Sequence, residues 1–329
     1  MDNEYMQKYL ITGYSGFVGY HFLSYLNSIA KEKVFVIGLD IIFPNDFSNW
    51  SFNNLEIIHK TINLLDFNEV NSVITEYIPT HIVHLAAFSS VGKSWKDPSG
   101  YFSNNVGAFL NIVESIRKNE IKCRILNIGS SEEYGSVNEK QIPILETNRI
   151  NPDNPYAVTK MSQEGLAHVY SSGFGMDIIS TRSFNHIGPR QRDVFVVAAF
   201  TKQVAQAVID ERKALDMITG DLNVIRDFLD VRDVVSAYYL LLEKGISGEV
   251  YNVCSGEGIP LQRIISELSN ISGISISNHV SPDLLRPNDI KKIIGSNEKL
   301  KKDTNWERNY SLEETLADTL NYWEEQLSK

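Results

Sequence analysis

The sequence predicts an α/β fold in which a doubly wound parallel sheet is joined to a smaller mixed α/β C-terminal domain. Three observations support this prediction. Short apolar runs alternate with helical stretches in the first half of the 329 residues, a glycine-rich turn precedes the first helical stretch, and the alternation weakens after residue 188. The composition, 43% apolar and 22% charged, is typical of a globular protein and excludes a mainly disordered chain.

The strands are predicted from short runs that are rich in β-branched residues and apolar on both faces. A parallel strand covered by helices on both sides has this character, whereas a half-exposed strand alternates apolar and polar residues. Six runs have it: 9–12, 34–39, 55–59, 81–85, 125–128 and 178–181.

The stretches between these strands are predicted to be helices. They lie at 17–29, 67–75, 101–117 and 156–171. Strands that alternate with helices in this way form a parallel sheet with helices on both faces, as in Rossmann-type folds.

After residue 188 the pattern becomes irregular, and proline and glycine interrupt it more often. We expect a helix, a strand and two further helices at 195–211, 224–229, 231–243 and 261–272. The first domain is therefore placed at 1–188 and the second at 189–329. Segment 231–253 is expected to return to the first domain.

Charge and cysteine content restrict the possible partners. The 31 basic and 41 acidic residues give a net charge of −10, which argues against a binder of nucleic acid or anionic membranes. Two cysteines are too few for a disulfide scaffold or a four-thiolate zinc site, so we expect buried thiols and no metal. With no signal-peptide pattern and no apolar run of about 18 residues, a cytoplasmic location is expected.

A glycine-rich segment between the first strand and the first helix predicts a dinucleotide site. Gly13, Gly16 and Gly19 are spaced GxxGxxG. In this order they allow a tight turn, a close approach of the backbone to a pyrophosphate, and close packing of helix on strand, while the helix N-terminus attracts the phosphates. The alternative is a plain β–α turn. The expected contacts also include Ser15, Phe17 and Val18.

Asp40, at the end of the second strand, predicts which dinucleotide binds. A carboxylate there accepts hydrogen bonds from the adenosine ribose and repels a 2′-phosphate, so NAD is favoured over NADP. An ordinary exposed acid at a strand end is the alternative interpretation. Asn63 and Leu64 follow the third strand and are expected to line the adenine, although a plain turn would place them similarly.

A tyrosine and a lysine predict acid–base chemistry. Tyr156 and Lys160 are four residues apart at the start of a helix and therefore share one face. A neighbouring ammonium group is expected to lower the pKa of the phenol from its usual value of about 10. Ser130 directly follows the fifth strand, where it can donate a hydrogen bond to a sugar oxygen beside the tyrosine. YxxxK also occurs by chance on exposed helices, so the interpretation depends on this context.

These motifs together resemble one known family. The three glycines, the segment HLAA at 84–87, Ser130, and the Tyr156/Lys160 pair are similar to the extended short-chain dehydrogenase/reductases that act on nucleotide sugars. Segments 129–135 and 175–191 look most like GDP-4-keto-6-deoxy-D-mannose reductases, with GDP-mannose 4,6-dehydratases as a neighbouring branch. The resemblance covers nearly the whole chain.

The resemblance implies further site residues. Leu85, Ala86 and Ala87 would contact the cofactor. On the substrate side, it implies that Asn185 and the loop after it hold the sugar diphosphate and that Ser90 contacts a sugar hydroxyl. It also implies that Arg226 and Arg286 reach the phosphates or the nucleoside ribose, and that Lys202 lies near the base or a phosphate. A surface ion pair is the alternative for each of the three cationic residues.

The dehydratase branch uses a carboxylate as a base, and Glu132 occupies the corresponding position here. This acid cannot separate the branches, because the reductase-like segment contains it too. The resemblance also implies a homodimer, with a tetramer as a further possibility. The expected seam is made by large apolar side chains of helices 101–117 and 156–171, namely Phe102, Phe109, Leu110, Leu166, Val169 and Tyr170. The alternative is that these side chains only face the sheet.

Taken together, the sequence predicts an NAD(H)-dependent oxidoreductase that acts at C4 of a nucleotide sugar, expected to be GDP-linked. A reductase of the 4-ketone and a 4-dehydrogenase both fit. A 4,6-dehydratase or 4-epimerase of the same family is the alternative. An idle dinucleotide-binding sensor or scaffold is a third hypothesis, which the intact set of Ser130, Tyr156 and Lys160 disfavours.

Overall fold

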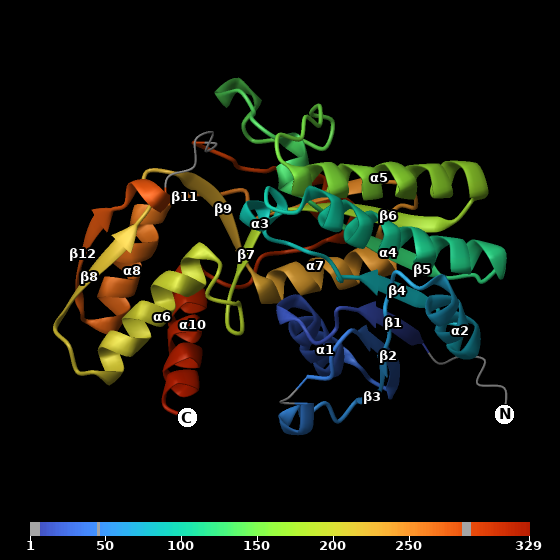
Figure 1. Ribbon diagram of the computed structural model, residues 1–329, viewed down its shortest axis with the longest axis horizontal. Coiled ribbons are helices and arrows are strands. Elements are labelled where there is room, and N and C mark those ends of the chain that lie inside the picture. Colours follow the sequence, from blue (N-terminus) through green and yellow to red (C-terminus); the bar gives the residue numbers. More distant parts are fainter. Residues whose placement is uncertain (1–6, 45–46, 285–290) are drawn as a thin grey trace.

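The computed structural model describes residues 7–44, 47–284 and 291–329 (Figure 1). A seven-stranded sheet forms its centre, and every strand pairs in parallel with its neighbours. The strand order is β10-β6-β5-β4-β1-β2-β3. In chain order the bounds are β1 Lys8–Thr12, β2 Val34–Asp40, β3 Leu55–Thr61, β4 His81–His84, β5 Arg124–Ser130, β6 Asp177–Ser183 and β10 Val250–Val253.

Two layers of helices cover the sheet, which confirms the predicted doubly wound α/β class. Helices α1 (Phe17–Ile29) and α7 (Val231–Lys244) share one buried apolar cluster on one face. Helices α2 (Phe67–Tyr77), α4 (Pro98–Lys118) and α5 (Pro155–Phe174) share another cluster on the opposite face. Apolar area removed from water on both faces explains the apolar runs within these strands, and the edge strand β3 is the least buried of the long ones.

The remaining elements of the first half are short. They are α3 Val91–Ser94 and the 3₁₀ turns η1 Phe47–Asn49, η2 Ser131–Tyr134 and η3 Glu139–Gln141. The predicted helix 156–171 extends to Phe174, where Gly175 ends it with φ of 68°. A left-handed residue is a common helix stop, and glycine adopts it without a steric penalty.

The second half of the chain builds a separate apolar cluster beside the sheet. Two small sheets belong to it, β11-β9-β7 and β12-β8, and Figure 1 shows them on the opposite side of the molecule from α2. The bounds are β7 Asn185–Ile187, α6 Val196–Ile209, β8 Ala214–Thr219, β9 Ile225–Asp230, β11 Gly258–Pro260, α8 Leu261–Ser272, β12 Ser275–Val280, η4 Pro282–Leu284 and α10 Leu312–Leu327.

The chain crosses between the two halves several times. Segment 231–253 contains α7, which packs on α1, and β10, which pairs with β6 in the central sheet. Helix α9 (Glu298–Thr304) also packs on α7 and β10, and Trp306 is buried in the same cluster as α1 and α7. This second return was not predicted from the sequence, because no local pattern distinguishes α9 from an outer helix.

The side chains expected at a dimer seam divide into three groups. Phe109 and Tyr170 are buried core residues, and Leu110 and Leu166 are partly buried against the same apolar cluster, as the alternative interpretation holds. Phe102 and Val169 are exposed to 47% and 53%. The homodimer stays a prediction, resting on a narrower apolar strip than the sequence suggested.

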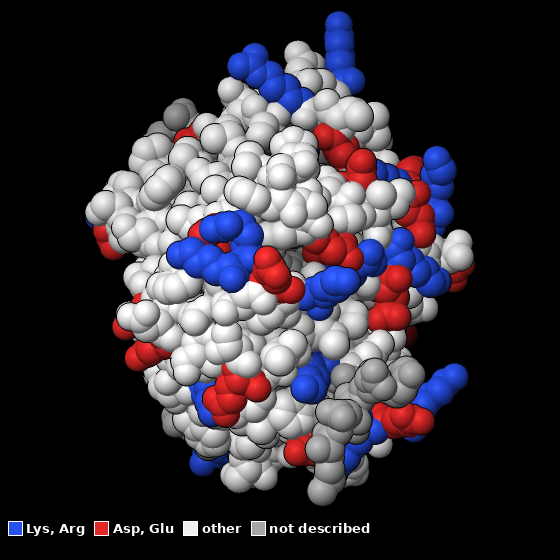
Figure 2. All heavy atoms as spheres, turned by 90° about the vertical axis from the view of Figure 1, so that its right-hand side faces the viewer, with Lys and Arg blue, Asp and Glu red and all other residues white. Residues whose placement is uncertain are grey.

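The surface and the thiols add two observations. On the face drawn in Figure 2, basic and acidic side chains lie next to one another over a largely uncharged surface. Cys254 is buried, Cys123 is partly buried, and neither forms a disulfide. Among the described residues, no helix combines the length and apolar character needed to cross a bilayer.

Candidate active site

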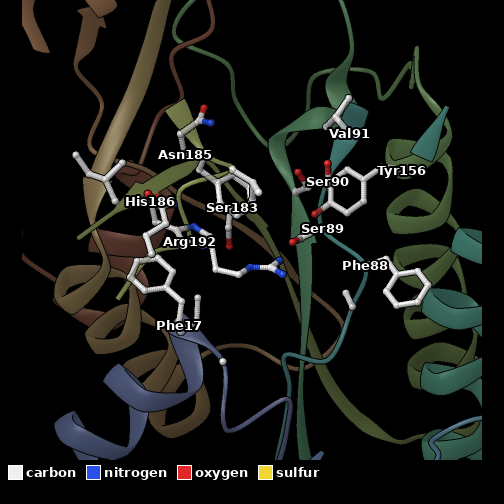
Figure 3. A pocket seen from close by; sticks show the side chains of 18 of the residues that line it. Phe17, Phe88, Ser89, Ser90, Val91, Tyr156, Ser183, Asn185, His186 and Arg192 are labelled. Atoms are coloured by element: carbon white, nitrogen blue, oxygen red, sulfur yellow. Dashed lines mark hydrogen bonds between the residues drawn. The ribbon is translucent and has the colours of Figure 1, made fainter. Parts of the chain in front are cut away.

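A cavity of about 1150 Å³ opens at the carboxyl ends of the central strands, where both halves of the molecule line it (Figure 3). Its walls include residues that follow β1, β2, β4 and β5, together with residues of β7, α6 and β9. Crevices at this edge of a parallel sheet are the usual ligand sites of α/β folds. Most residues that the sequence singled out meet here.

The glycine loop forms a cradle at one end of this cavity. Gly13 has φ of 66°, and its N–H donates to the Leu39 carbonyl at 2.8 Å. A Cβ on Gly13 would lie 2.9 Å from the Ala86 backbone nitrogen, so only glycine lets this loop approach the residues after β4 so closely. Gly16 precedes α1 without a side-chain cap, which leaves the amides and positive dipole of its first turn available to an anion. Ser15, Phe17 and Val18 also line the cavity.

Gly19 has a packing role. A Cβ at this position would lie 2.4 Å from the Tyr14 carbonyl oxygen. Only glycine therefore lets α1 approach the preceding turn this closely, as the glycine spacing predicted.

Asp40 lies at the cavity end of β2, where the sequence placed it. The Ser15 hydroxyl donates to its Oδ2, and the Ile41 N–H donates to its Oδ1 at 2.8 Å. A carboxylate oxygen can accept more than one hydrogen bond, so ribose hydroxyls can still be bound. The exposed side chains of Ile41 and Ile42 continue this wall without a positive charge.

The adjoining wall comes from the turns after β3 and β4. Asn63 accepts from the Leu65 N–H at 3.0 Å, so its side chain forms the plain turn considered above while the residue still lines the cavity. Leu64 lines it too, and its carbonyl accepts from Asn111 at 2.9 Å. Leu85, Ala86 and Ala87 complete this wall.

The three residues proposed for acid–base chemistry come together at the other end. Ser130 ends β5, and Tyr156 and Lys160 lie in the first two turns of α5. Asn154 caps this helix by accepting from the Ala157 N–H at 2.9 Å. Figure 3 shows the Tyr156 hydroxyl directed into the cavity beside Ser90. Both Tyr156 and Lys160 are almost fully buried.

The expected effect of Lys160 on Tyr156 is wrong in this structure. The Lys160 ammonium donates to the Ile128 carbonyl at 2.8 Å, and the pKa of Tyr156 is raised above its usual value because the phenol is buried. A hydrogen bond with Ser130 acts in the opposite direction but does not offset the burial. Burial also lowers the pKa of Lys160 to about 8. Tyr156 is therefore a neutral phenol, suited to donate a proton.

Glu132 lies in the same wall, and the Asn154 amide donates to its carboxylate at 2.9 Å. The residue that caps α5 thus also orients Glu132. This contact holds the carboxylate in the cavity wall that also contains Tyr156. A dehydratase would need its base at such a position.

Only some of the predicted substrate residues line the cavity. Ser90, Asn185 and Arg226 line the cavity, and Asn185 projects into it from the opposite side to Tyr156 (Figure 3). Lys202 is absent from the lining: it pairs with Asp193 at 2.7 Å and lies over the Trp323 ring. The ion-pair alternative describes it better, since its helix position turns it away from the opening. Arg286 lies outside the described residues.

Arg192 lines the cavity but was not among the residues that the sequence predicted. It lies in the loop after Asn185, and Figure 3 shows its guanidinium extending between Phe17 and Ser89. Arg190, two residues earlier, also lines the cavity, and its guanidinium lies over the Tyr20 ring at 3.9 Å. Two arginines in one loop at the cavity suggest anion binding.

Comparison with known proteins agrees with this geometry. The profile of the family described as GDP-mannose 4,6 dehydratase matches residues 10–319. The GDP-6-deoxy-D-mannose reductase of Pseudomonas aeruginosa is 32% identical over 318 residues, which cover 97% of each chain.

Solved structures extend this likeness to the fold. The structure of RMD from Pseudomonas aeruginosa complexed with NADPH has a TM-score of 0.83 and 30% identity, covering 98% of each chain. The Thermus thermophilus UDP-glucose 4-epimerase in complex with NAD has a TM-score of 0.81 and 26% identity, covering 96% of this chain and 99% of its own.

Proposed function

The chain belongs to the GDP-mannose 4,6-dehydratase family of nucleotide-sugar enzymes, and we propose that it is an NAD(H)-dependent reductase of a GDP-linked 4-keto-6-deoxyhexose. The observation that carries the proposal is the buried side chain of Tyr156 beside Ser130, in the cavity that the glycine cradle also lines. The 32% identity to a GDP-6-deoxy-D-mannose reductase over 97% of both chains favours the GDP-sugar branch.

In this proposal each half of the cavity binds a different ligand. Residues 1–188, with the returning segment 231–253, bind the dinucleotide. Residues 189–329 supply Arg192 and Arg226 for the diphosphate of the sugar nucleotide, because a guanidinium group pairs with phosphate in a bidentate manner. The glycine cradle and the uncapped first turn of α1 fit the pyrophosphate of NAD.

When bound, NADH supplies a hydride to C4 of the sugar. Tyr156 donates its phenolic proton to the C4 oxygen, so the ketone becomes a hydroxyl group and the phenol is later reprotonated from water. Ser130 donates a hydrogen bond to the same oxygen and holds it in place. Lys160 holds the Ile128 carbonyl, one residue before the Gly129–Ser130 pair, and fixes the end of the strand.

The direct test is turnover by the purified protein. A GDP-linked 4-keto-6-deoxyhexose and NADH should be consumed together, as followed by the absorbance of reduced nicotinamide. The UDP- and dTDP-linked ketones should react at least about 10-fold more slowly, because one well-placed base contact is worth about 1.4 kcal/mol or more. Equal rates for all three nucleotides would contradict the assignment to GDP-sugars.

A 4,6-dehydratase is the second candidate, because Glu132 is held in the site by Asn154. Such an enzyme must remove the C5 proton and lose water, whereas the reductase leaves C5 untouched. We expect no C5 deuterium and no loss of water when GDP-mannose and NAD are incubated with the enzyme in heavy water. Mass spectrometry of the sugar nucleotide measures both. Deuterium at C5 together with loss of water would assign Glu132 as the base of a dehydratase.

Asp40 is proposed to select NADH over NADPH. Asp40→Ala should shift the ratio of the two dissociation constants toward NADPH by about 10- to 100-fold, because it removes a charge-assisted hydrogen bond to the ribose and a repulsion of the 2′-phosphate. Fluorescence titration with each reduced cofactor measures this ratio. Glu32→Ala, at an exposed turn outside the cavity, is the matched control and should leave the ratio unchanged. An unchanged ratio in Asp40→Ala would refute the role of this carboxylate.

A further inference from the structure

A second carboxyl group lies directly beneath the proposed catalytic residues. Glu133 follows Glu132 in the short turn η2, but its side chain is completely buried, whereas Glu132 lines the cavity. Burying a carboxyl group is costly unless its oxygens are paired. The surroundings of Glu133 therefore need a physical explanation.

One oxygen of Glu133 is bound to the residue that the reaction needs. Its Oε1 accepts the backbone N–H of Ser130 at 2.7 Å. The Ser130 hydroxyl in turn accepts the Glu132 N–H at 3.2 Å, so the serine and Glu133 form a reciprocal capping box. The Ser130 backbone is thus fixed by a side chain that has no contact with solvent.

The other side of this strand end is held by Lys160. Its ammonium donates to the Ile128 carbonyl at 2.8 Å, so buried ionisable side chains hold the backbone on both sides of Gly129. A Cβ at Gly129 would lie 2.2 Å from the Thr181 carbonyl oxygen on β6 and 2.5 Å from Glu133 Oε1. Glycine at 129 therefore lets β6 approach and also leaves room for the carboxyl group beside the Ser130 amide.

The charged groups around Glu133 do not satisfy its second oxygen. Glu164 on α5 and Arg182 on β6 pair with each other through two contacts of 2.6 and 2.8 Å. Among the described residues, Glu133 Oε2 has no hydrogen-bond partner. Burial and the nearby Glu164 raise the pKa of Glu133 well above its ordinary value. The side chain keeps one essential contact, to Ser130, and lacks a compensating ion pair of its own.

We propose that Glu133 is a positioning residue: its Oε1 holds the Ser130 amide and thereby sets the serine hydroxyl relative to Tyr156. The inference rests on the proposed function in one respect, that Ser130 and Tyr156 act on the sugar oxygen. The proposal requires that the Ser130 N–H donate a hydrogen bond to Glu133 Oε1 across this distance. It does not require a negative charge on Glu133.

Three substitutions separate the reach of the hydrogen-bond acceptor from the carboxyl group itself. Glu133→Gln keeps an acceptor at the same reach and removes the ionisable group, so kcat should stay within about threefold of the wild type. Glu133→Asp keeps a carboxyl group but is shorter by about 1.5 Å, and Glu133→Asn is equally short and not ionisable. Both short variants should lower kcat by about 10- to 100-fold while KM for the sugar and Kd for NADH remain unchanged.

The matched controls use a second capping box at the start of α10, where Ser311 is capped by Glu314 away from the cavity. Glu314→Gln and Glu314→Asp should leave kcat unchanged. Full activity in Glu133→Asp would overturn the proposal. Equal losses in Glu133→Gln and Glu133→Asp would also overturn it, because the charge and the length would then matter alike.

Hydrogen exchange of the Ser130 amide provides a readout that needs no sugar. In the NADH-bound protein, protection should be retained in Glu133→Gln and lost in the two short variants. If the short variants do not fold, the exchange in Glu133→Gln decides: retained protection supports the hydrogen bond, and lost protection overturns it. A wild type that turns over no 4-keto sugar would instead refute the proposed function, and the exchange result would stand separately.

Discussion

Tyr156→Phe is expected to lower kcat for the 4-keto sugar by about 10²- to 10⁴-fold, the usual contribution of a general acid. The substitution removes only the hydroxyl that supplies the proton, and the ring remains in its buried place at the start of α5. Kd for NADH should therefore change by less than about twofold. Steady-state kinetics and fluorescence titration measure the two quantities.

A change of pH should not rescue this variant. Burial raises the pKa of Tyr156, so the wild-type phenol keeps its proton throughout the neutral range, and the variant has no proton to supply at any pH. Tyr25→Phe is the matched control, because Tyr25 lies on α1 beside Tyr239 and outside the cavity. Full activity in Tyr156→Phe would show that another group delivers the proton.

Trp306→Ala is expected to lower the free energy of unfolding by about 3–5 kcal/mol, as large-to-small substitutions of buried aromatic residues do. Trp306 is 1% exposed and packs in the cluster formed by α1 and α7. Its indole N–H donates to the Asp233 carbonyl and the Ser236 hydroxyl, both at 3.1 Å. The substitution leaves a cavity and removes both hydrogen bonds. Urea unfolding followed by circular dichroism measures the change.

Trp95→Ala provides the comparison, because Trp95 is 62% exposed. Its effect should stay within about 0.5 kcal/mol, as is usual for surface positions. If Trp306→Ala lowered the free energy of unfolding as little as Trp95→Ala does, the segment that follows α9 would contribute little to the core of the first half. That outcome would contradict the close packing of α9 and Trp306 on α7.

Several features of the site were predictable because short stretches of chain determine them. The glycine spacing at 13–19 specifies a tight turn and a close helix–strand approach whatever surrounds it. The strands were recognisable because burial on both faces requires apolar residues throughout. The four-residue spacing of Tyr156 and Lys160 likewise placed both side chains on one helix face.

Other features depend on which distant segments meet. The spacing of Tyr156 and Lys160 could not reveal that the ammonium would bind the Ile128 carbonyl of β5 instead of the phenol. Lys202 was expected near the substrate, yet α6 turns it toward Asp193. Of the adjacent acids Glu132 and Glu133, nothing local indicated which one would be buried.

The individual strands, the glycine cradle and the helix that carries Tyr156 could be predicted from the chain alone, because each follows from hydrogen bonding and apolar periodicity within about 20 neighbouring residues. The return of α9 and Trp306 to the first half, the protonation preference of Tyr156, and the contact between Glu133 and Ser130 could not. These depend on desolvation and on contacts between distant segments. Water is excluded, and partners are chosen, only when those segments pack together.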